Sequence, residues 1–216
     1  MTPSTSKRQV AVQVYQRLRA AHPDAHCALD HDGPFQLAVA TVLSAQCTDE
    51  RVNQVTPALF TRFPTPEALA GAAPAEVEAL VRPTGFFRNK ARNLIGLARA
   101  LVERHDGKLP AEMDALVALP GVGRKTANVL LGTAFGKNEG VVVDTHVKRL
   151  SRRLGWTKHD DPLRVERDLM GPFPKNDWTD LSHVLIFHGR RVCRARTPRC
   201  GACPVARRCP SSREDA

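Results

Sequence analysis

Apolar residues recur every three to four positions along most of this 216-residue chain, as they do on the buried face of an α-helix. Val10, Val14 and Leu18 form the first such run, which His22 and Pro23 end. The same pattern predicts further helices, which we expect over Phe35–Leu43, Phe87–His105, Ala111–Leu119, Arg124–Phe135, Thr145–Leu154 and Asp177–Gly189.

Three pairs, each of a capping residue and a proline, mark additional helix starts. A Thr or Asp side chain can accept a hydrogen bond from an unpaired amide of the first turn, and proline lacks such an amide. We therefore expect helices to begin at Thr56-Pro57, Thr65-Pro66 and Asp161-Pro162. Only Val141–Val143 reads as a strand. Three residues cannot build a sheet, so the chain is predicted to be all-α.

Composition supports this fold class and adds a partner. Aromatic residues make up only 5% of the chain, which argues against an all-β protein. The formal net charge of +10 favours a polyanionic partner such as a nucleic acid. The N-terminus is polar, and no stretch approaches the roughly 20 apolar residues of a membrane helix. We therefore expect a cytoplasmic protein that is not secreted, in which cysteines are metal ligands or free thiols.

A glycine-containing segment, Leu119–Ala127, separates two of the expected helices and reads Leu-Pro-Gly-Val-Gly-Arg-Lys-Thr-Ala. Gly121 and Gly123 allow a tight turn and a close approach of the backbone to a ligand. The helix that starts at Arg124 offers unpaired amides and the positive end of its dipole, which suit a phosphate group.

Four interpretations of this segment compete. A P-loop needs glycine directly before its lysine, where this chain has Arg124 before Lys125. A dinucleotide fingerprint follows a strand, whereas the preceding segment reads as helix. An ordinary helix turn with glycines remains open. So does a helix-hairpin-helix, which holds the DNA backbone without reading its sequence and would use Gly121, Val122 and Gly123.

A second motif, Val143–Val147, reads Val-Asp-Thr-His-Val and opens an amphipathic helix. Taken alone, Asp144 is an N-cap and needs no other role. The same cap would also fix a carboxylate at a helix terminus, where it could face a pocket. His146 is expected to be structural or a minor DNA contact.

Four cysteines near the C-terminus form a third motif, because Cys193, Cys200, Cys203 and Cys209 are separated by six, two and five residues. Four thiolates in so short a stretch predict one metal centre, either zinc or an iron–sulfur cluster. Basic residues crowd the same stretch. They are either a solvated face or a phosphate-binding surface, and they comprise Arg190, Arg191, Arg194, Arg196 and Arg199.

The combination of motifs closely resembles the endonuclease III family. Leu43–Asp49 reads Leu-Ser-Ala-Gln-Cys-Thr-Asp, and His188-Gly189-Arg190 precedes the first cysteine, both as in that family. Together with the hairpin segment, the Val-Asp-Thr-His-Val motif and the four cysteines, these stretches occur in the family's order from about Val10 to Pro210.

The resemblance implies a two-domain helix-hairpin-helix DNA glycosylase fold. A six-helix barrel carrying the hairpin would span residues 27–137, and residues 1–26 with 138–216 would form a domain holding a [4Fe-4S] cluster on the four cysteines. The implied partner is double-stranded DNA with a damaged pyrimidine or an abasic site, bound between the domains by a nucleoid-associated monomer. DNA contacts would come from the hairpin and from Arg190, Arg194, Arg196 and Arg199.

The resemblance also implies roles for single residues. Lys125 would be the nucleophile that forms a Schiff base and cleaves the strand 3′ of the abasic site by β-elimination, with Asp144 as the second catalytic group. Gln46 would fill the space left by the flipped nucleotide. Phe86 falls where the family often has a leucine wedge, which puts the opposite-base preference in doubt.

Two other functions share part of this evidence. One is a glycosylase without lyase activity, of the adenine-mismatch type. Glycosylases of that type also carry the cluster, but they lack a lysine at the hairpin position and usually have an added C-terminal domain. A non-enzymatic DNA-binding module with a structural metal would explain the hairpin, cysteines and charge. It gives no reason for Lys125 and Asp144 together.

Overall fold

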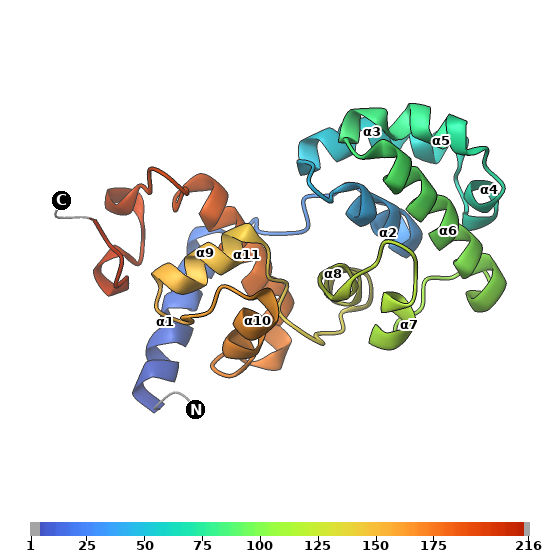
Figure 1. Ribbon diagram of the computed structural model, residues 1–216. Helices are drawn as coiled ribbons and strands as arrows, with labels where there is room; N and C mark the ends of the chain where they lie inside the picture. Colours follow the sequence, from blue (N-terminus) through green and yellow to red (C-terminus); the bar gives the residue numbers. More distant parts are fainter. Residues whose placement is uncertain (1–4, 214–216) are drawn as a thin grey trace. The chain divides into compact units, whose positions relative to one another are not determined.

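The computed structural model describes residues 5–213, which consist of helices and loops and include no strand (Figure 1). The all-α expectation is therefore confirmed. The helices are α1 (Thr5–Ala21), α2 (Gly33–Leu43), α3 (Asp49–Arg62), α4 (Pro66–Ala70), α5 (Pro74–Val81), α6 (Phe87–His105), α7 (Met113–Val117), α8 (Arg124–Phe135), α9 (Thr145–Arg153), α10 (Pro162–Met170) and α11 (Trp178–Arg191). Short 3-10 turns occur at Arg82–Thr84, Lys175–Asp177, Cys200–Ala202 and Ala206–Arg208.

The chain divides into two compact units, Cys27–Lys137 and a second one made of Met1–His26 with Asn138–Ala216. Residues 1–4 and 214–216 of the second unit lie outside the described part. Each unit has its own apolar core, so each is described by itself.

The Cys27–Lys137 unit is built around α6, which packs against α4 and α5, while α2 packs against α8 and α3. Its core is aliphatic, with Leu37, Leu94, Leu101 and Leu130 fully buried. Gly96 lets α6 lie close to the turn before α8, because a Cβ there would come within 3.2 Å of the Pro120 ring. This packing fixes the glycine-containing turn on a rigid support.

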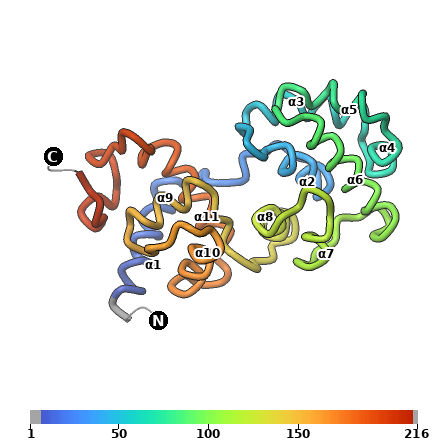
Figure 2. Tube along the Cα trace, in the orientation of Figure 1, coloured from blue at the N-terminus to red at the C-terminus, as the bar shows by residue number. Residues whose placement is uncertain are grey.

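The second unit brings the N-terminal helix against the C-terminal ones. Helix α11 packs against both α9 and α1, and α9 also packs against α10 (Figure 2). Tyr15 of α1 lies edge-on to Phe173 in this core and donates its hydroxyl to Asp180 of α11. The N-terminal helix is therefore part of the same core as the segment that carries the cysteines.

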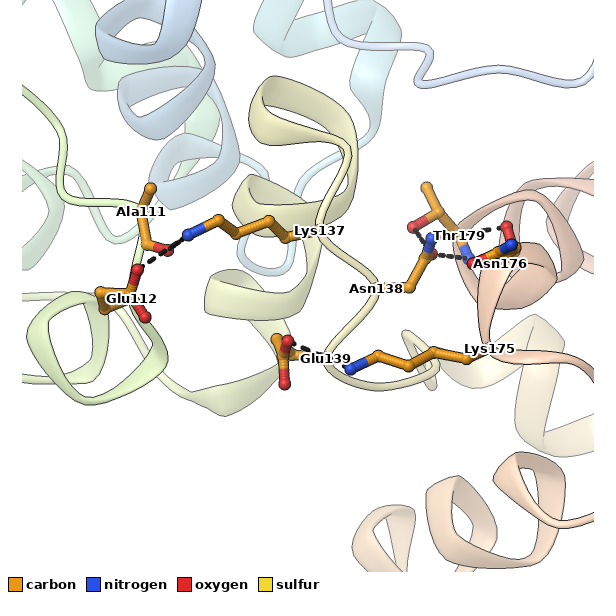
Figure 3. Close-up of polar contacts among 8 residues, drawn as sticks. All are labelled: Ala111, Glu112, Lys137, Asn138, Glu139, Lys175, Asn176 and Thr179. Atoms are coloured by element: carbon orange, nitrogen blue, oxygen red, sulfur yellow. Dashed lines mark hydrogen bonds and ion pairs between the residues drawn. The ribbon is translucent and has the colours of Figure 1, made fainter.

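Figure 3 shows the point where the chain passes from one unit to the other, at the peptide bond between Lys137 and Asn138. Lys137 Nζ donates to Ala111 O (2.8 Å) and to the Glu112 carboxylate (2.7 Å), both in its own unit. The Asn138 side-chain oxygen accepts from the backbone N–H (2.9 Å) and hydroxyl (2.6 Å) of Thr179. Each of the two consecutive residues is thus fixed to its own unit.

Two of the three proline-marked helix starts are confirmed. The Thr65 side chain accepts from Ala68 N (3.3 Å), and the Asp161 side chain accepts from Arg164 N (3.0 Å). The prediction at Thr56-Pro57 is wrong, because Pro57 lies inside α3, which starts eight residues earlier with Thr48 as its cap. Burial of Val52, Val55, Thr56 and Leu59 along one face of α3 outweighs the cost of an interior proline, about 3 kcal/mol.

The expected strand at Val141–Val143 is also wrong. All three residues are buried, but Val142 N donates to the Ser182 hydroxyl (3.0 Å) rather than to a second strand. The helix expected over Ala111–Leu119 is shorter than predicted, because the chain is helical only over Met113–Val117 before the turn begins.

Candidate functional site

The segment Leu119–Ala127 forms the turn between α7 and α8, so the structure has a helix, a hairpin and a second helix at this place. Val122 N donates to Leu119 O (3.1 Å), which closes the turn, and the Val122 side chain is buried beneath it. Gly121 has φ +79°, and a Cβ there would lie 3.0 Å from Asn93. The turn therefore requires glycine at this position.

Gly123 differs from Gly121, because neither its backbone angles nor its packing within the protein requires a glycine. Its φ of −91° and ψ of 174° suit any residue, and a Cβ added there would meet nothing within 4 Å. Gly123 is the N-cap of α8, where the first backbone amides of the helix lack helical acceptors. The bare backbone at Gly123 is therefore open to an external group such as a phosphate.

Lys125 lies in this first turn of α8 with its side chain exposed. Among the described residues its amine has no ion-pair partner, and the first turn of α8 contains no acidic residue. The chain thus presents a primary amine directly after an amide-rich turn that suits an anion.

Asp144 is the N-cap of α9, as the capping interpretation predicts. One carboxylate oxygen, Oδ1, accepts from Val147 N at 2.7 Å, and the side chain is half-buried. This bond fixes the carboxylate at the end of α9, where the positive end of the helix dipole favours its charge.

His146, two residues later, is held by the crossing of α9 and α11. Its Nδ1 lies 3.1 Å from Nη2 of Arg149, and a Cβ at Gly189 of α11 would come within 2.8 Å of the same Nδ1. Burial lowers the pKa of His146, and the charge of Asp144 partly offsets this shift. The side chain therefore has a structural place in the second unit.

Gln46 and Phe86 share an unusual backbone conformation, with φ of 53° and 48°. Both side chains are exposed, and Phe86 is 63% accessible, which is exceptional for a large apolar residue. Left-handed backbone costs a non-glycine residue roughly 1–2 kcal/mol, so the backbone is strained at both positions.

The loop of Phe86 is braced from inside the unit by a buried lysine. Lys90 Nζ donates to Thr84 O (2.7 Å), just before the loop, and Lys90 N donates to Phe86 O (3.1 Å). Burial lowers the pKa of Lys90. Sequence reasoning missed this lysine, because nothing in its spacing distinguishes it from the charged residues on the exposed face of α6.

The four C-terminal cysteines line one small pocket that is partly open to solvent. No three ligand side chains among residues 5–213 lie close enough together to hold a single metal ion. A single zinc ion needs four sulfurs about 2.3 Å from its centre, whereas an iron–sulfur cluster spaces its thiolates further apart. Four thiolates are a donor set that either zinc or an iron–sulfur cluster accepts.

Two arginines of α9 hold the cysteine loop, and no sequence motif predicts either role. Arg153 donates to Cys193 Sγ (3.2 Å) and to Ala195 O (2.7 Å). Arg149 donates to Gly189 O and to Cys193 O, both at 3.0 Å. The arginines that the sequence analysis did single out all have exposed side chains, and they are Arg190, Arg191, Arg194, Arg196 and Arg199.

Comparisons with known proteins agree with this geometry. The family model of the HhH-GPD superfamily of base excision DNA repair proteins matches residues 39–175. Endonuclease III of Synechocystis sp. is 56% identical over 207 residues, which cover 96% of this chain and 94% of the relative. The chain belongs to the endonuclease III family.

Other members support the same assignment. Endonuclease III of Bacillus subtilis is 46% identical over 188 residues, covering 87% of this chain and 85% of the relative. The solved structure of a trapped endonuclease III–DNA covalent intermediate is 44% identical, with a TM-score of 0.90 over 94% of this chain and 96% of that one. The predicted helix-hairpin-helix glycosylase fold is thus confirmed. As a family member, the chain is a base excision repair DNA glycosylase with AP lyase activity.

No helix in residues 5–213 combines the length and the apolar character needed to cross a bilayer.

Proposed function

We propose that this chain removes oxidised pyrimidines from double-stranded DNA and then cleaves the strand at the abasic site, with Lys125 as the nucleophile. The observation that carries the proposal is the exposed Lys125 amine in the first turn of α8, directly after the hairpin. A relative of the same fold forms a covalent intermediate with DNA. We further propose that the protein acts as a monomer at the nucleoid, where its substrate lies.

In this proposal the hairpin binds one phosphate beside the lesion. The backbone amides of Gly121 and Gly123 and the α8 dipole favour an anion at that point. The Val122 amide already donates to Leu119 O, so Val122 would support the contact by closing the turn. Arg124 would add a positive charge, and Arg190, Arg194, Arg196 and Arg199 would contact phosphates further away. Such contacts position the protein on the duplex without reading its sequence.

The damaged nucleotide must leave the duplex before the Lys125 amine can reach it, which costs a few kcal/mol in lost stacking. We propose that Phe86 and Gln46 offset part of this cost by occupying the space that the nucleotide leaves. Their strained backbone and exposed side chains support that role. We also propose that His146 makes a minor contact with the DNA.

The chemistry then follows from the amine. Deprotonated Lys125 Nζ attacks C1′ of the sugar, the C1′–N bond to the base breaks, and the base leaves with the bonding electron pair. Opening of the sugar gives an imine between Nζ and C1′. Loss of a C2′ proton then expels the 3′ phosphate oxygen, which breaks the strand on the 3′ side.

Asp144 supplies a negative charge to this reaction in our proposal. Its Oδ1 is occupied by the bond from Val147 N, so Oδ2 is the atom that would stabilise the positive sugar or accept a proton. Lys125 belongs to the Cys27–Lys137 unit and Asp144 to the other, so the proposal requires both units to bind the same lesion. These units would act as the hairpin domain and the cluster domain.

We propose that Cys193, Cys200, Cys203 and Cys209 hold a [4Fe-4S] cluster. The donor set supports this proposal, because four thiolates suit iron–sulfur chemistry and the four residues line one pocket. When bound, the cluster would close the loop that carries Arg194, Arg196 and Arg199 and so hold these side chains for phosphate contact.

Replacing one ligand tests the cluster proposal. Cys209→Ser should reduce bound iron and inorganic sulfide to a small fraction of the wild-type content and should lower the thermal stability of the protein. Cys27→Ser is the matched control, because Cys27 packs against the core of the other unit and should leave the iron content unchanged. Full iron loading of the Cys209 variant would contradict the proposal.

Gly123→Ala tests the hairpin contact. The added Cβ meets nothing within 4 Å and the backbone suits alanine, so the melting temperature should not change. A phosphate held against the bare backbone would be displaced, and loss of one charge-assisted hydrogen bond weakens DNA binding by about tenfold or more. Fluorescence anisotropy with a duplex containing an abasic-site analogue measures the affinity. Gly71→Ala, at a turn remote in sequence from the hairpin, should bind as the wild type does.

A further inference from the structure

A pair of buried histidines connects the end of the N-terminal helix to the cysteine pocket. His22, just after α1, and His188 of α11 are 6% and 2% exposed, respectively. His22 Nε2 lies 2.9 Å from His188 Nδ1, and His188 Nε2 lies 3.4 Å from Cys203 Sγ. The two rings are arranged edge to face with centroids 5.2 Å apart. The three side chains therefore form one continuous line of polar contacts inside the second unit.

The chemistry of the line fixes the direction of each bond. A cysteine that ligates iron is a thiolate and can only accept, so His188 Nε2 must carry the hydrogen that it shares with Cys203. A buried imidazole avoids a second proton, which leaves Nδ1 of His188 as an acceptor. His22 Nε2 must then be the donor, and His22 Nδ1 is left as a lone-pair atom. That atom is indeed buried without a hydrogen-bond partner among the described residues.

We propose that His188 is a positioning residue that donates an N–H bond to the sulfur of Cys203, and that His22 holds His188 in the tautomer that makes this bond possible. This inference rests on the proposed cluster. The bond would stabilise the more electron-rich state of the cluster and so raise its reduction potential, since hydrogen bonds to the ligating sulfurs are among the features that set that potential.

The place of His22 gives the N-terminal helix a role at the cluster. His22 N donates to Leu18 O (3.0 Å) at the end of α1, and α1 packs along α11 in the same unit. His22, which orients His188, thus lies 181 positions before Cys203 in the sequence. No cysteine motif would identify such a contact.

The test measures the reduction potential of the purified, cluster-loaded protein by electrochemistry, together with the rate at which an oxidant bleaches the visible absorbance of the cluster. His188→Leu removes the donor at similar volume, whereas His188→Gln keeps an N–H at the end of the side chain. We expect a lower potential and several-fold faster bleaching for His188→Leu, and substantial recovery of both for His188→Gln. His183→Leu on the same helix is the control and should match the wild type.

His22 provides the second arm, because its side chain bonds to His188 and makes no hydrogen bond to a cysteine within residues 5–213, so its loss need not disturb the ligands directly. We expect His22→Leu to shift the potential in the same direction as His188→Leu but by less, and His22→Gln to restore it. If folded, fully loaded His188→Leu and His22→Leu both keep the wild-type potential, the inference is overturned while the cluster stands. If the His188→Leu protein does not take up a cluster, the potentials of His22→Leu and His22→Gln decide whether the inference holds. If the purified wild-type protein contains no iron and no inorganic sulfide, the cluster proposal and this inference are both overturned.

Discussion

Lys125→Ala should abolish strand cleavage at an abasic site, with a loss on the order of 10³-fold or more in the rate of the chemical step. The reason is that the proposed reaction passes through an imine on Nζ, and no other group in the first turn of α8 can form one. Single-turnover cleavage of an end-labelled duplex, analysed on a denaturing gel, measures the rate. DNA affinity should fall only modestly, since one of several positive charges is lost.

The matched control for this prediction is Lys108→Ala, which removes an exposed lysine of the same unit that lies outside the hairpin segment. Its cleavage rate should equal that of the wild type. Wild-type cleavage by folded Lys125→Ala protein would contradict the assignment of the nucleophile.

Asp144→Asn should lower the rate of base removal by about 10²- to 10³-fold while leaving the fold nearly unchanged. Asparagine keeps an oxygen that can accept from Val147 N, so the cap of α9 survives and only the charge is lost. Asp144→Ala removes both the charge and the cap, which costs about 1 kcal/mol and lowers the melting temperature by about 2–4 °C for a protein of this size.

The comparison between these two variants separates the structural role of Asp144 from its chemical role. The proposal predicts similar rate losses but different melting temperatures. If Asp144→Asn instead cleaves at the wild-type rate and only Asp144→Ala is impaired, the carboxylate is a helix cap and nothing more. Thermal melts and single-turnover assays on a duplex with an oxidised pyrimidine distinguish the outcomes.

The sequence was sufficient to predict the start of a helix wherever residues close together in the chain determine it. Thr65 and Asp161 cap the helices that begin at the prolines after them, and Asp144 caps α9, because each side-chain oxygen accepts from a backbone amide only three residues later. The apolar spacing of α6 gave both of its ends, Phe87 and His105.

The sequence was insufficient where packing across the unit decided the outcome. Pro57 looks like a helix start, but the buried face of α3 carries the helix through it. Val141–Val143 looks like a strand, but its amide finds the Ser182 hydroxyl 40 residues later instead of a neighbouring strand. For Val142 the deciding partner is distant in the sequence, and for Pro57 the deciding feature is the burial of one whole face of α3.

The same division applies to the candidate site. The resemblance to the endonuclease III family named Lys125 and Asp144 as candidates, and the spacing of the four cysteines marked them as candidate metal ligands. They could not identify Arg153 beside Cys193 Sγ or His188 beside Cys203 Sγ, since these contacts depend on how α9 and α11 fold against the cysteine loop. The strained backbone of Gln46 and Phe86 was likewise visible only in three dimensions.

The most direct test of the central claim is to trap the proposed intermediate and locate it in the chain. Borohydride reduces an imine to a stable amine, so protein incubated with a duplex containing thymine glycol or a plain abasic site should become covalently attached to DNA. Proteolysis and mass spectrometry of the adduct should place the attached sugar on Lys125. An adduct on any other amine, or no adduct from cluster-loaded protein that binds both duplexes, would contradict the account.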